Sequence, residues 1–329
     1  MSSWAKIAAT GAKAVEVVEK AVEVVENIQA QMESLSVDHD DFSEAHSTDD
    51  AVKILWKIDT NRLSPGEDYK IDVQGYTHYH GDADYARRPL FDFVKPEVFE
   101  RPTYKMFLDL LDNYTREIGK AEKVSFQERQ EIQDFLDEII KTRVMQYVRS
   151  YLINKGKCTS DPGAFKTLLY NLWFGMYKST RDGGVDSCGF EHVFVGEEAD
   201  HKNQITGCHG WIQLYNEEKN GRLDYHGYIS MNRTRPSDEQ HILTLQFTLL
   251  DEEDGSEDKK PMSTSFIGVS PEFEIGLYTL LALAPGPETK EERGKQVTKC
   301  DFGDHQAEIN IVTWDWYGKT RIRTAYPEE

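Results

Sequence analysis

The sequence predicts an α+β protein in which a helical region comes first and a β-rich half follows. Between about residues 103 and 177, apolar side chains recur every three or four positions, which is the spacing of one helix face. After residue 190 the pattern changes to short runs of β-branched and aromatic residues bounded by glycines, which is typical of strands. We therefore expect one globular domain over residues 50–329, mainly helical at 50–182 and β-rich at 183–329.

Residues 1–48 are expected to lie outside that domain. Two seven-residue units, AVEVVEK and AVEVVEN, follow each other and place four valines three and four residues apart. This spacing predicts an amphipathic helix over residues 5–35. Its valine face would pack on this protein or on a partner, or join two copies of the chain by self-association. The acidic, serine-containing residues 36–50 predict a flexible linker.

The globular part is expected to begin at residues 51–58, and helices are expected within 103–152 and at 165–177. Their apolar positions repeat at helical spacing, so these stripes are expected to be core. The run Ser125-Phe126-Gln127-Glu128 has the pattern of a capping box, in which serine and glutamate each bond the other's backbone. This pattern predicts a helix that begins at Phe126.

The β-rich half contains six candidate strands. The runs at 190–197 and 207–215 open with glycine and are rich in aromatic and β-branched residues. Residues 272–284 predict a short helix, and the acidic residues 251–260 predict a loop that ends in Lys259 and Lys260. The remaining strands are expected at 224–231, 241–249, 263–268 and 308–315.

Charge restricts the function. The formal net charge is −20 at pH 7, so the chain as a whole repels polyanions such as RNA. A nucleic-acid partner therefore requires a local basic cleft or bound divalent cations, and carboxylate-rich surfaces favour hard cations.

The cysteine pattern and the beginning of the chain predict an intracellular, cytoplasmic protein. The four cysteines form no close C-x-x-C pair and no dense framework. The first residues show no positively charged start followed by an apolar run, and no stretch of eighteen apolar residues predicts a membrane span.

Two histidines are the strongest candidates for chemistry. His192 and His209 fall inside the first two predicted strands, about seventeen residues apart, which would allow the strands to be neighbours. A facing pair of histidines can supply a general acid and a general base near neutral pH. Two alternatives remain open from the residues alone: the histidines are structural, or they bind zinc together with Cys188 and Cys208.

Three motifs around these residues resemble the EndoU family, the poly(U)-specific endoribonucleases. They are FEHVFVGE at 190–197, GCHGWI at 207–212 and FIGVSPEFE at 266–274, in the family's order. The resemblance extends from about residue 50 to the end of the chain and implies the catalytic fold of that family. Two neighbours of the second histidine depart from the family pattern, because Cys208 and Gly210 stand where phenylalanine and asparagine are usual.

The resemblance implies a set of site residues. It makes His209 the general base and His192 the general acid, although the two roles could be exchanged. It makes Lys260 the cation that stabilises the transition state, with Lys259 as the alternative. Three residues are implied in substrate binding, namely Thr264, Tyr326 and Ser270, and three in support of the site, namely Glu191, Glu197 and Asp315.

The resemblance also implies an activity. The family cleaves single-stranded RNA at uridylates, by attack of the 2′-hydroxyl, and leaves 2′,3′-cyclic phosphate ends. It depends on Ca²⁺ or Mn²⁺, for which the sequence identifies no ligands. The expected partner is unpaired, U-rich RNA. The alternative is a catalytically silent RNA-binding module of the same fold.

Overall fold

The computed structural model describes residues 47–329 apart from 82, 122, 181–182, 199–202 and 252–254. The helix predicted at 5–35 and its self-association lie outside these residues, as does most of the predicted linker. Within the part of the chain that is described, no helix has the length and apolar character needed to cross a membrane.

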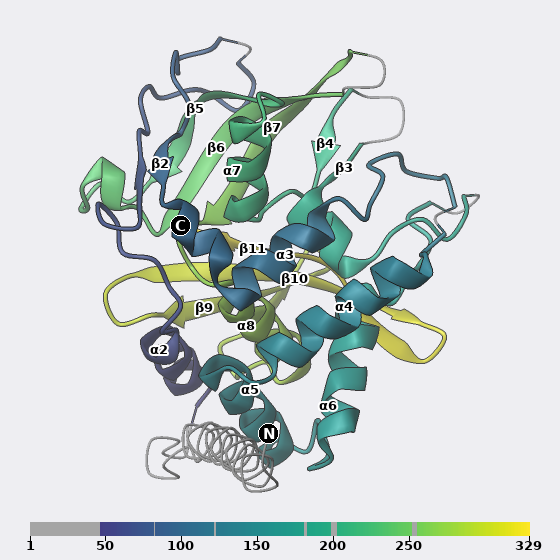
Figure 1. The fold of residues 1–329 in the computed structure, drawn as a ribbon. Helices are drawn as coiled ribbons and strands as arrows, with labels where there is room; N and C mark the ends of the chain where they lie inside the picture. The colour runs from purple at the N-terminus through teal and green to yellow at the C-terminus, as the bar shows by residue number, and fades with distance from the viewer. Residues whose placement is uncertain (1–46, 82, 122, 181–182, 199–202, 252–254) are drawn as a thin grey trace, which may run out of the picture. The chain divides into compact units, whose positions relative to one another are not determined.

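Helices dominate the first half of the described chain, as predicted (Figure 1). The predicted capping box at Ser125 is confirmed, because the Glu128 amide donates to Ser125 Oγ at 3.1 Å and the Ser125 amide donates to Glu128 Oε2 at 2.6 Å. Two short strands, β1 (Tyr69–Ile71) and β2 (Phe91–Val94), pair in the same region. The helices are α2 (Thr48–Ile58), η1 (Pro96–Glu100), α3 (Pro102–Leu111), α4 (Phe126–Ile139), α5 (Arg143–Asn154), α6 (Pro162–Leu169) and η2 (Tyr170–Phe174).

Two antiparallel sheets form most of the second half. One has the order β5-β6-β7 and the other the order β11-β10-β9-β8. The strands predicted at 224–231, 241–249, 263–268 and 308–315 are confirmed. The first sheet contains β5 (Leu223–Met231), β6 (Ile242–Leu250) and β7 (Glu257–Phe266), and the second contains β8 (Lys290–Glu292), β9 (Lys295–Asp301), β10 (Gln306–Trp316) and β11 (Lys319–Glu328).

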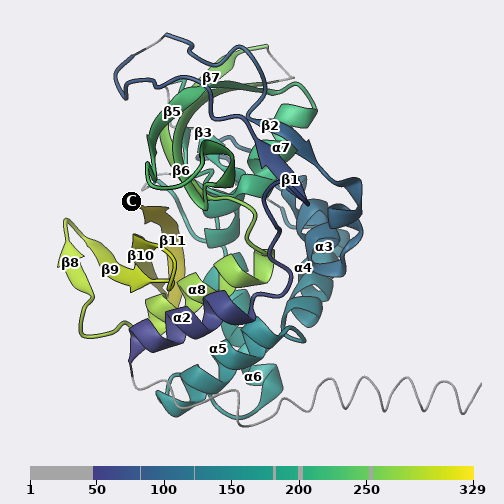
Figure 2. The ribbon, with the colours of Figure 1, turned by 90° about the vertical axis from the view of Figure 1, so that its left-hand side faces the viewer.

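The predicted helix at 272–284 is confirmed as α8 (Pro271–Leu283), and it is the central core helix. Figures 1 and 2 show α8 next to the β8–β11 sheet, with α2 and α5 close by. A side chain at Gly276 would lie 3.1 Å from both Val144 and Val148 of α5, so the two helices pack closely. Every residue from Pro271 to Ala282 is buried.

The strands predicted at 190–197 and 207–215 are wrong. Most of the first run forms a π-helical turn, η3 (Glu191–Val195), and the second run leads into helix α7 (Trp211–Lys219). Both segments are buried on nearly all sides, so their apolar residues do not follow the period of either structure. A short, continuously apolar run cannot distinguish a buried strand from a buried helix. The true strands here are the two-residue pair β3 (Glu197–Glu198) and β4 (Ile205–Thr206).

The loop predicted at 251–260 is too long by four residues. Strand β7 begins at Glu257, so Lys259 and Lys260 lie in a strand that pairs with β6. Pairing with β6 stabilises this polar segment, although its own residues are not typical of a strand.

Candidate active site

His192 is held by a carboxylate. Its Nδ1 atom lies 2.6 Å from Oε2 of Glu197, which is buried at the start of β3. An ionised carboxylate only accepts hydrogen bonds, so Nδ1 donates and Nε2 is left for a substrate. A side chain at Gly207 would lie 3.1 Å from Cδ2 of His192, so the ring lies against the segment that contains His209.

Backbone bonds connect the two histidines. The Cys208 amide donates to the His192 carbonyl oxygen at 3.0 Å, and the His209 amide donates to the Val193 carbonyl oxygen at 2.6 Å. The sequence predicted neighbouring strands here. The structure instead joins a π-helical turn to the loop before α7, and the two histidines still come close together.

His209 is buried, with 7% of its surface exposed. Its Nδ1 atom donates to the carbonyl oxygen of Thr264 at 2.9 Å, so Nε2 carries the lone pair in the neutral ring. Burial, and next the charge of Lys260, hold the pKa of His209 well below its usual value of 6.5. A ring that is neutral at physiological pH and has a free Nε2 atom is suited to act as a general base.

Lys260 is the lysine of this site. It is 6% exposed, and burial lowers its pKa from 10.5 to about 8. Its charge contributes to the low pKa of His209, which makes the two residues neighbours. Lys259 instead donates from Nζ to the carbonyl oxygen of Gly81 at 2.7 Å. The pairing of β6 and β7 shifts register directly after Lys260, a distortion of the kind that redirects side chains near active sites.

Tyr326 reaches the site from the second sheet. Its ring stacks on His209, with centroids 4.8 Å apart and planes 16° apart. The Lys295 ammonium, from β9, donates to the Tyr326 hydroxyl at 2.7 Å. Sequence reasoning missed Lys295, because β9 lies in a polar stretch where no strand was predicted.

Thr264 and Ser263 support His209 from β7. Thr264 supplies its carbonyl oxygen to His209, and its hydroxyl lies 3.0 Å from that of Thr244. Ser263, which the sequence did not single out, donates to the Cys208 carbonyl oxygen at 2.7 Å, with its hydroxyl 3.3 Å from His209 Nδ1. The alternation of side chains along β7 does not predict these contacts. They form only because the loop before α7, which carries Cys208 and His209, packs against this strand.

Two of the expected residues lie apart from the others. Ser270 is fully buried and caps α8 by accepting from the Phe273 amide at 3.1 Å. Asp315 is exposed and accepts from the Gly318 amide at 2.9 Å in the β10–β11 turn. Asp315 pairs with Thr320, which is six residues from Tyr326 along β11 and so about 20 Å away.

Glu191 is buried directly before His192 in η3, with 1% exposed. Cys188 and Cys208 are also fully buried. Among the described residues, no three histidine, cysteine, aspartate or glutamate side chains come together in a way that could hold a metal ion. The zinc alternative therefore has no support among these residues, and they hold no set of three such side chains for Ca²⁺ or Mn²⁺.

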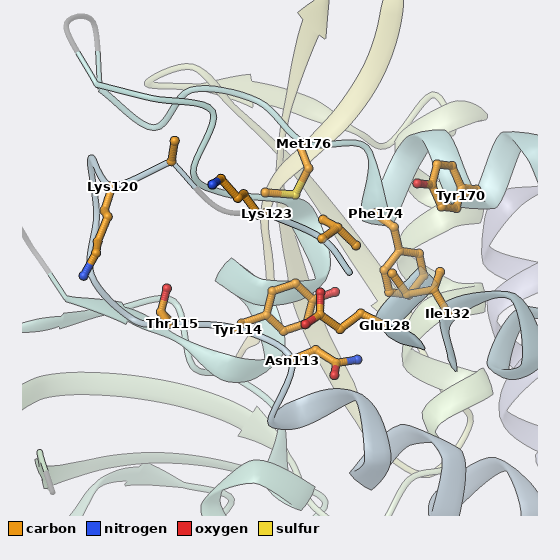
Figure 3. A pocket seen from close by; sticks show the side chains of 12 residues that line it. Asn113, Tyr114, Thr115, Lys120, Lys123, Glu128, Ile132, Tyr170, Phe174 and Met176 are labelled. Carbon is orange, nitrogen blue, oxygen red and sulfur yellow. The ribbon is translucent and has the colours of Figure 1, made fainter. Parts of the chain in front are cut away.

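Two of the smaller cavities among the described residues lie near this region. One, of about 300 Å³, lies among the loop at 113–124, α4 and η2 (Figure 3). Figure 3 shows Tyr114, Phe174, Ile132 and Met176 around it, and neither histidine of the site nor Lys260 lines it. The other, of about 250 Å³, has His192 and Glu197 in its wall.

The arrangement combines three chemical groups. A neutral histidine with a free nitrogen can accept a proton, a second histidine bonded to a carboxylate can donate one, and a buried lysine can stabilise negative charge. This combination suits proton transfer at a phosphodiester, where charge develops on phosphate oxygens.

Comparison with known proteins agrees with this chemistry. The sequence profile described as "Endoribonuclease XendoU" matches residues 47–327. Poly(U)-specific endoribonuclease-A of Xenopus laevis is 40% identical over 280 residues, which cover 83% of this chain and 90% of the relative. Uridylate-specific endoribonuclease C of Danio rerio is 42% identical over 283 residues, which cover 83% and 85%.

A solved structure agrees as well. The structure described as "XendoU: a splicing independent snoRNA processing endoribonuclease" matches with a TM-score of 0.70 and 37% sequence identity. The match covers 87% of this chain and 98% of that one. The chain therefore belongs to the XendoU family of endoribonucleases.

Proposed function

We propose that this protein cleaves single-stranded RNA at uridylates by transesterification. The observation that carries the proposal is the bond from His209 Nδ1 to the Thr264 carbonyl oxygen, which leaves Nε2 of a buried, neutral ring free to act as a base. Relatives at about 40% identity carry the names poly(U)-specific and uridylate-specific endoribonuclease.

The reaction follows from the three groups. His209 Nε2 takes the proton of the 2′-hydroxyl, and the 2′-oxygen attacks the neighbouring phosphorus. Lys260 stabilises the charge that grows on the phosphate oxygens. The bond from phosphorus to the 5′-oxygen then breaks, and His192 Nε2 gives that oxygen a proton. The products are a 2′,3′-cyclic phosphate and a free 5′-hydroxyl.

Uridine recognition is assigned to the His209 side of the site. Tyr326 offers an aromatic ring that already stacks on His209, and an unpaired base or ribose could pack against its edge or free face. The Thr264 hydroxyl, next to Thr244, is a hydrogen-bonding group for the base. A base must leave a duplex to reach these groups, so the proposed substrate is unpaired.

Divalent cations are proposed to act on charge and not in the chemical step. The chain carries a net charge of −20, and Ca²⁺ or Mn²⁺ would reduce its repulsion of RNA. The proton transfers are already assigned to the histidines and the stabilising charge to Lys260, so no step is assigned to a metal.

Alanine substitutions test the proposal. His192→Ala and His209→Ala should each lower cleavage of a uridine-containing oligonucleotide by about 10²–10⁴-fold, the usual contribution of a general acid or base. Lys260→Ala should also abolish cleavage, whereas Lys259→Ala is the matched control and should remain active. Circular dichroism checks that each variant is folded.

A substrate with 2′-deoxyuridine at the cut site provides the second test. It should resist cleavage, because the attacking oxygen is missing. Cleavage of this substrate would mean that water is the nucleophile and that the mechanism is wrong. Tight RNA binding with no cleavage of the ribose substrate would favour the alternative, a silent binding module of the same fold.

A further inference from the structure

Hydrogen bonds connect the segments that form the walls of the cavity beside His192. Tyr177 and Ser187 form an isolated β-bridge, and the Asp186 carboxylate accepts from the Ser179 amide at 2.8 Å. The same carboxylate accepts from the Gly119 amide at 2.6 Å, which fixes the loop at 116–120. Asp186 is 2% exposed, so buried hydrogen bonds hold the described part of the cavity wall.

The contents of the cavity wall suit a nucleoside. The lining includes His192 and Glu197 from the catalytic site, the Ser179 and Thr180 side chains, and Arg323 of β11. The remaining walls are mostly apolar, and the volume of about 250 Å³ is close to the lower end for small-molecule sites, about 300 Å³. A cavity of this volume can hold one nucleobase but is too small for a base pair.

Arg323 is the only lysine or arginine among the described residues that line this cavity. Its side chain is exposed, and its guanidinium carbon lies 4.9 Å from the centre of the Trp314 ring. A guanidinium held on an aromatic face presents a planar set of donors, which matches phosphate oxygens. In a chain of net charge −20, a cation at this position favours a phosphate locally.

We propose that this cavity binds the nucleoside on the 3′ side of the cleaved bond, and that Arg323 binds the next phosphate. The inference rests on the proposed function. His192 protonates the leaving 5′-oxygen, so the nucleoside that carries this oxygen lies next to His192. The uridine lies on the other side, against His209 and Tyr326.

Three substrates separate the contribution of the downstream nucleoside from that of its phosphate. Uridine 3′-(4-nitrophenyl) phosphate has no downstream nucleoside, UpA has the nucleoside, and UpAp adds the terminal phosphate. Arg323→Gln should lower kcat/KM for UpAp about tenfold, the effect of one charge-assisted hydrogen bond. It should change kcat/KM for the other two substrates less than twofold. Thr180→Trp, which fills the cavity, should lower kcat/KM for UpA and UpAp and spare the nitrophenyl ester.

Lys319→Gln is the control for Arg323→Gln. It removes the same charge from the same strand, but Lys319 donates to Asn171 at 3.0 Å and does not line the cavity. All three substrates should react with it as with the unaltered protein. An equal loss on all three substrates in Arg323→Gln, or no loss on any, would overturn the proposal.

A measurement of binding affinity tests the subsite independently of cleavage. The analogue of UpAp with 2′-deoxyuridine lacks the nucleophile, and its affinity should fall about tenfold in Arg323→Gln. If the unaltered protein binds this analogue but cleaves no ribose substrate, the proposed reaction fails while the affinity difference still supports the subsite. Equal affinity in both proteins would overturn the subsite.

Discussion

The Nδ1 atom of His209 lies 2.9 Å from the carbonyl oxygen of Thr264, two residues before the end of β7. A carbonyl oxygen can only accept, so this contact fixes the tautomer of the ring and directs Nε2 away from the strand. Strand β7 also carries Lys260, four residues earlier. One strand therefore sets both the tautomer of the base and the position of the cation.

The alkaline limb of cleavage should report Lys260 together with His192, because both must be protonated in the proposed reaction. Burial lowers its pKa to about 8, so the cation is present below about pH 8 and is lost as the pH rises through that value. Lys260→Arg should keep part of the activity and move the alkaline limb of kcat/KM to higher pH, because guanidinium stays charged. An alkaline limb that stays in place in this variant would show that another group causes it.

The acid limb should report His209. Its pKa lies well below 6.5, so the ring stays neutral and able to act as a base at mildly acidic pH. We expect kcat/KM to fall only at pH values below the usual histidine range. A fall centred at pH 6.5 or above would mean that His209 is not the base in the free enzyme.

Gly207 is required for the approach of the two histidine segments. Its φ is 66°, and a side chain there would lie 1.7 Å from the His192 carbonyl oxygen. Gly207→Ala should therefore abolish cleavage and destabilise the protein. Gly221→Ala is the control, because Gly221 has a φ of 73° but nothing within 4 Å of an added side chain. It should cost only the backbone strain, about 1–2 kcal/mol, with activity retained. Thermal unfolding and cleavage assays distinguish the two effects.

The sequence predicted the second half of the fold well where strands are long and rich in β-branched and aromatic residues. Residues in β6 and β10 carry strong apolar character, and their strands were found. The β8–β9 hairpin was missed because its charged residues are stabilised by pairing and not by burial, and this also hid Lys295. The segments that contain His192 and His209 were predicted as strands because continuous burial removes the period on which such predictions depend.

The site residues were predicted from motifs. The structure places some of them close together and others far apart. It brings His192, His209, Lys260 and Tyr326 together, while Ser270 caps a core helix and Asp315 lies in a distant turn. Arg323 could not be found from sequence, because its relation to His192 depends on how the second sheet meets η3.

Lys295 should act through Tyr326. Its ammonium donates to the Tyr326 hydroxyl and lies 5.3 Å from the ring centre, so it orients the ring that stacks on His209. Lys295→Met and Tyr326→Phe each break this bond and should lower kcat/KM about 10–100-fold, the value of one hydrogen bond to a charged group. The double variant should be no worse than either single one, because both remove the same contact. Lys290→Met, an exposed position on the neighbouring strand, is the control and should have no effect.

Cation dependence should follow the length of the RNA. A charge of −20 repels each phosphate, and a longer strand brings more phosphates close to the protein. Chelator should therefore reduce cleavage of a long U-rich RNA far more than cleavage of UpA, and Ca²⁺ or Mn²⁺ should restore it. The product should carry a cyclic phosphate with either metal.

Cobalt(III) hexammine decides between charge screening and a specific metal site. Its ammonia ligands do not exchange, so carboxylates cannot bind the metal directly, but its charge of three still offsets repulsion. The described residues contain no group of three side chains suited to a metal, so screening predicts that cobalt hexammine restores cleavage of the long RNA as Ca²⁺ does. Restoration by Ca²⁺ and Mn²⁺ with no effect of cobalt hexammine would instead require directly coordinating ligands, and calorimetry of Ca²⁺ binding to the full chain would then give their stoichiometry.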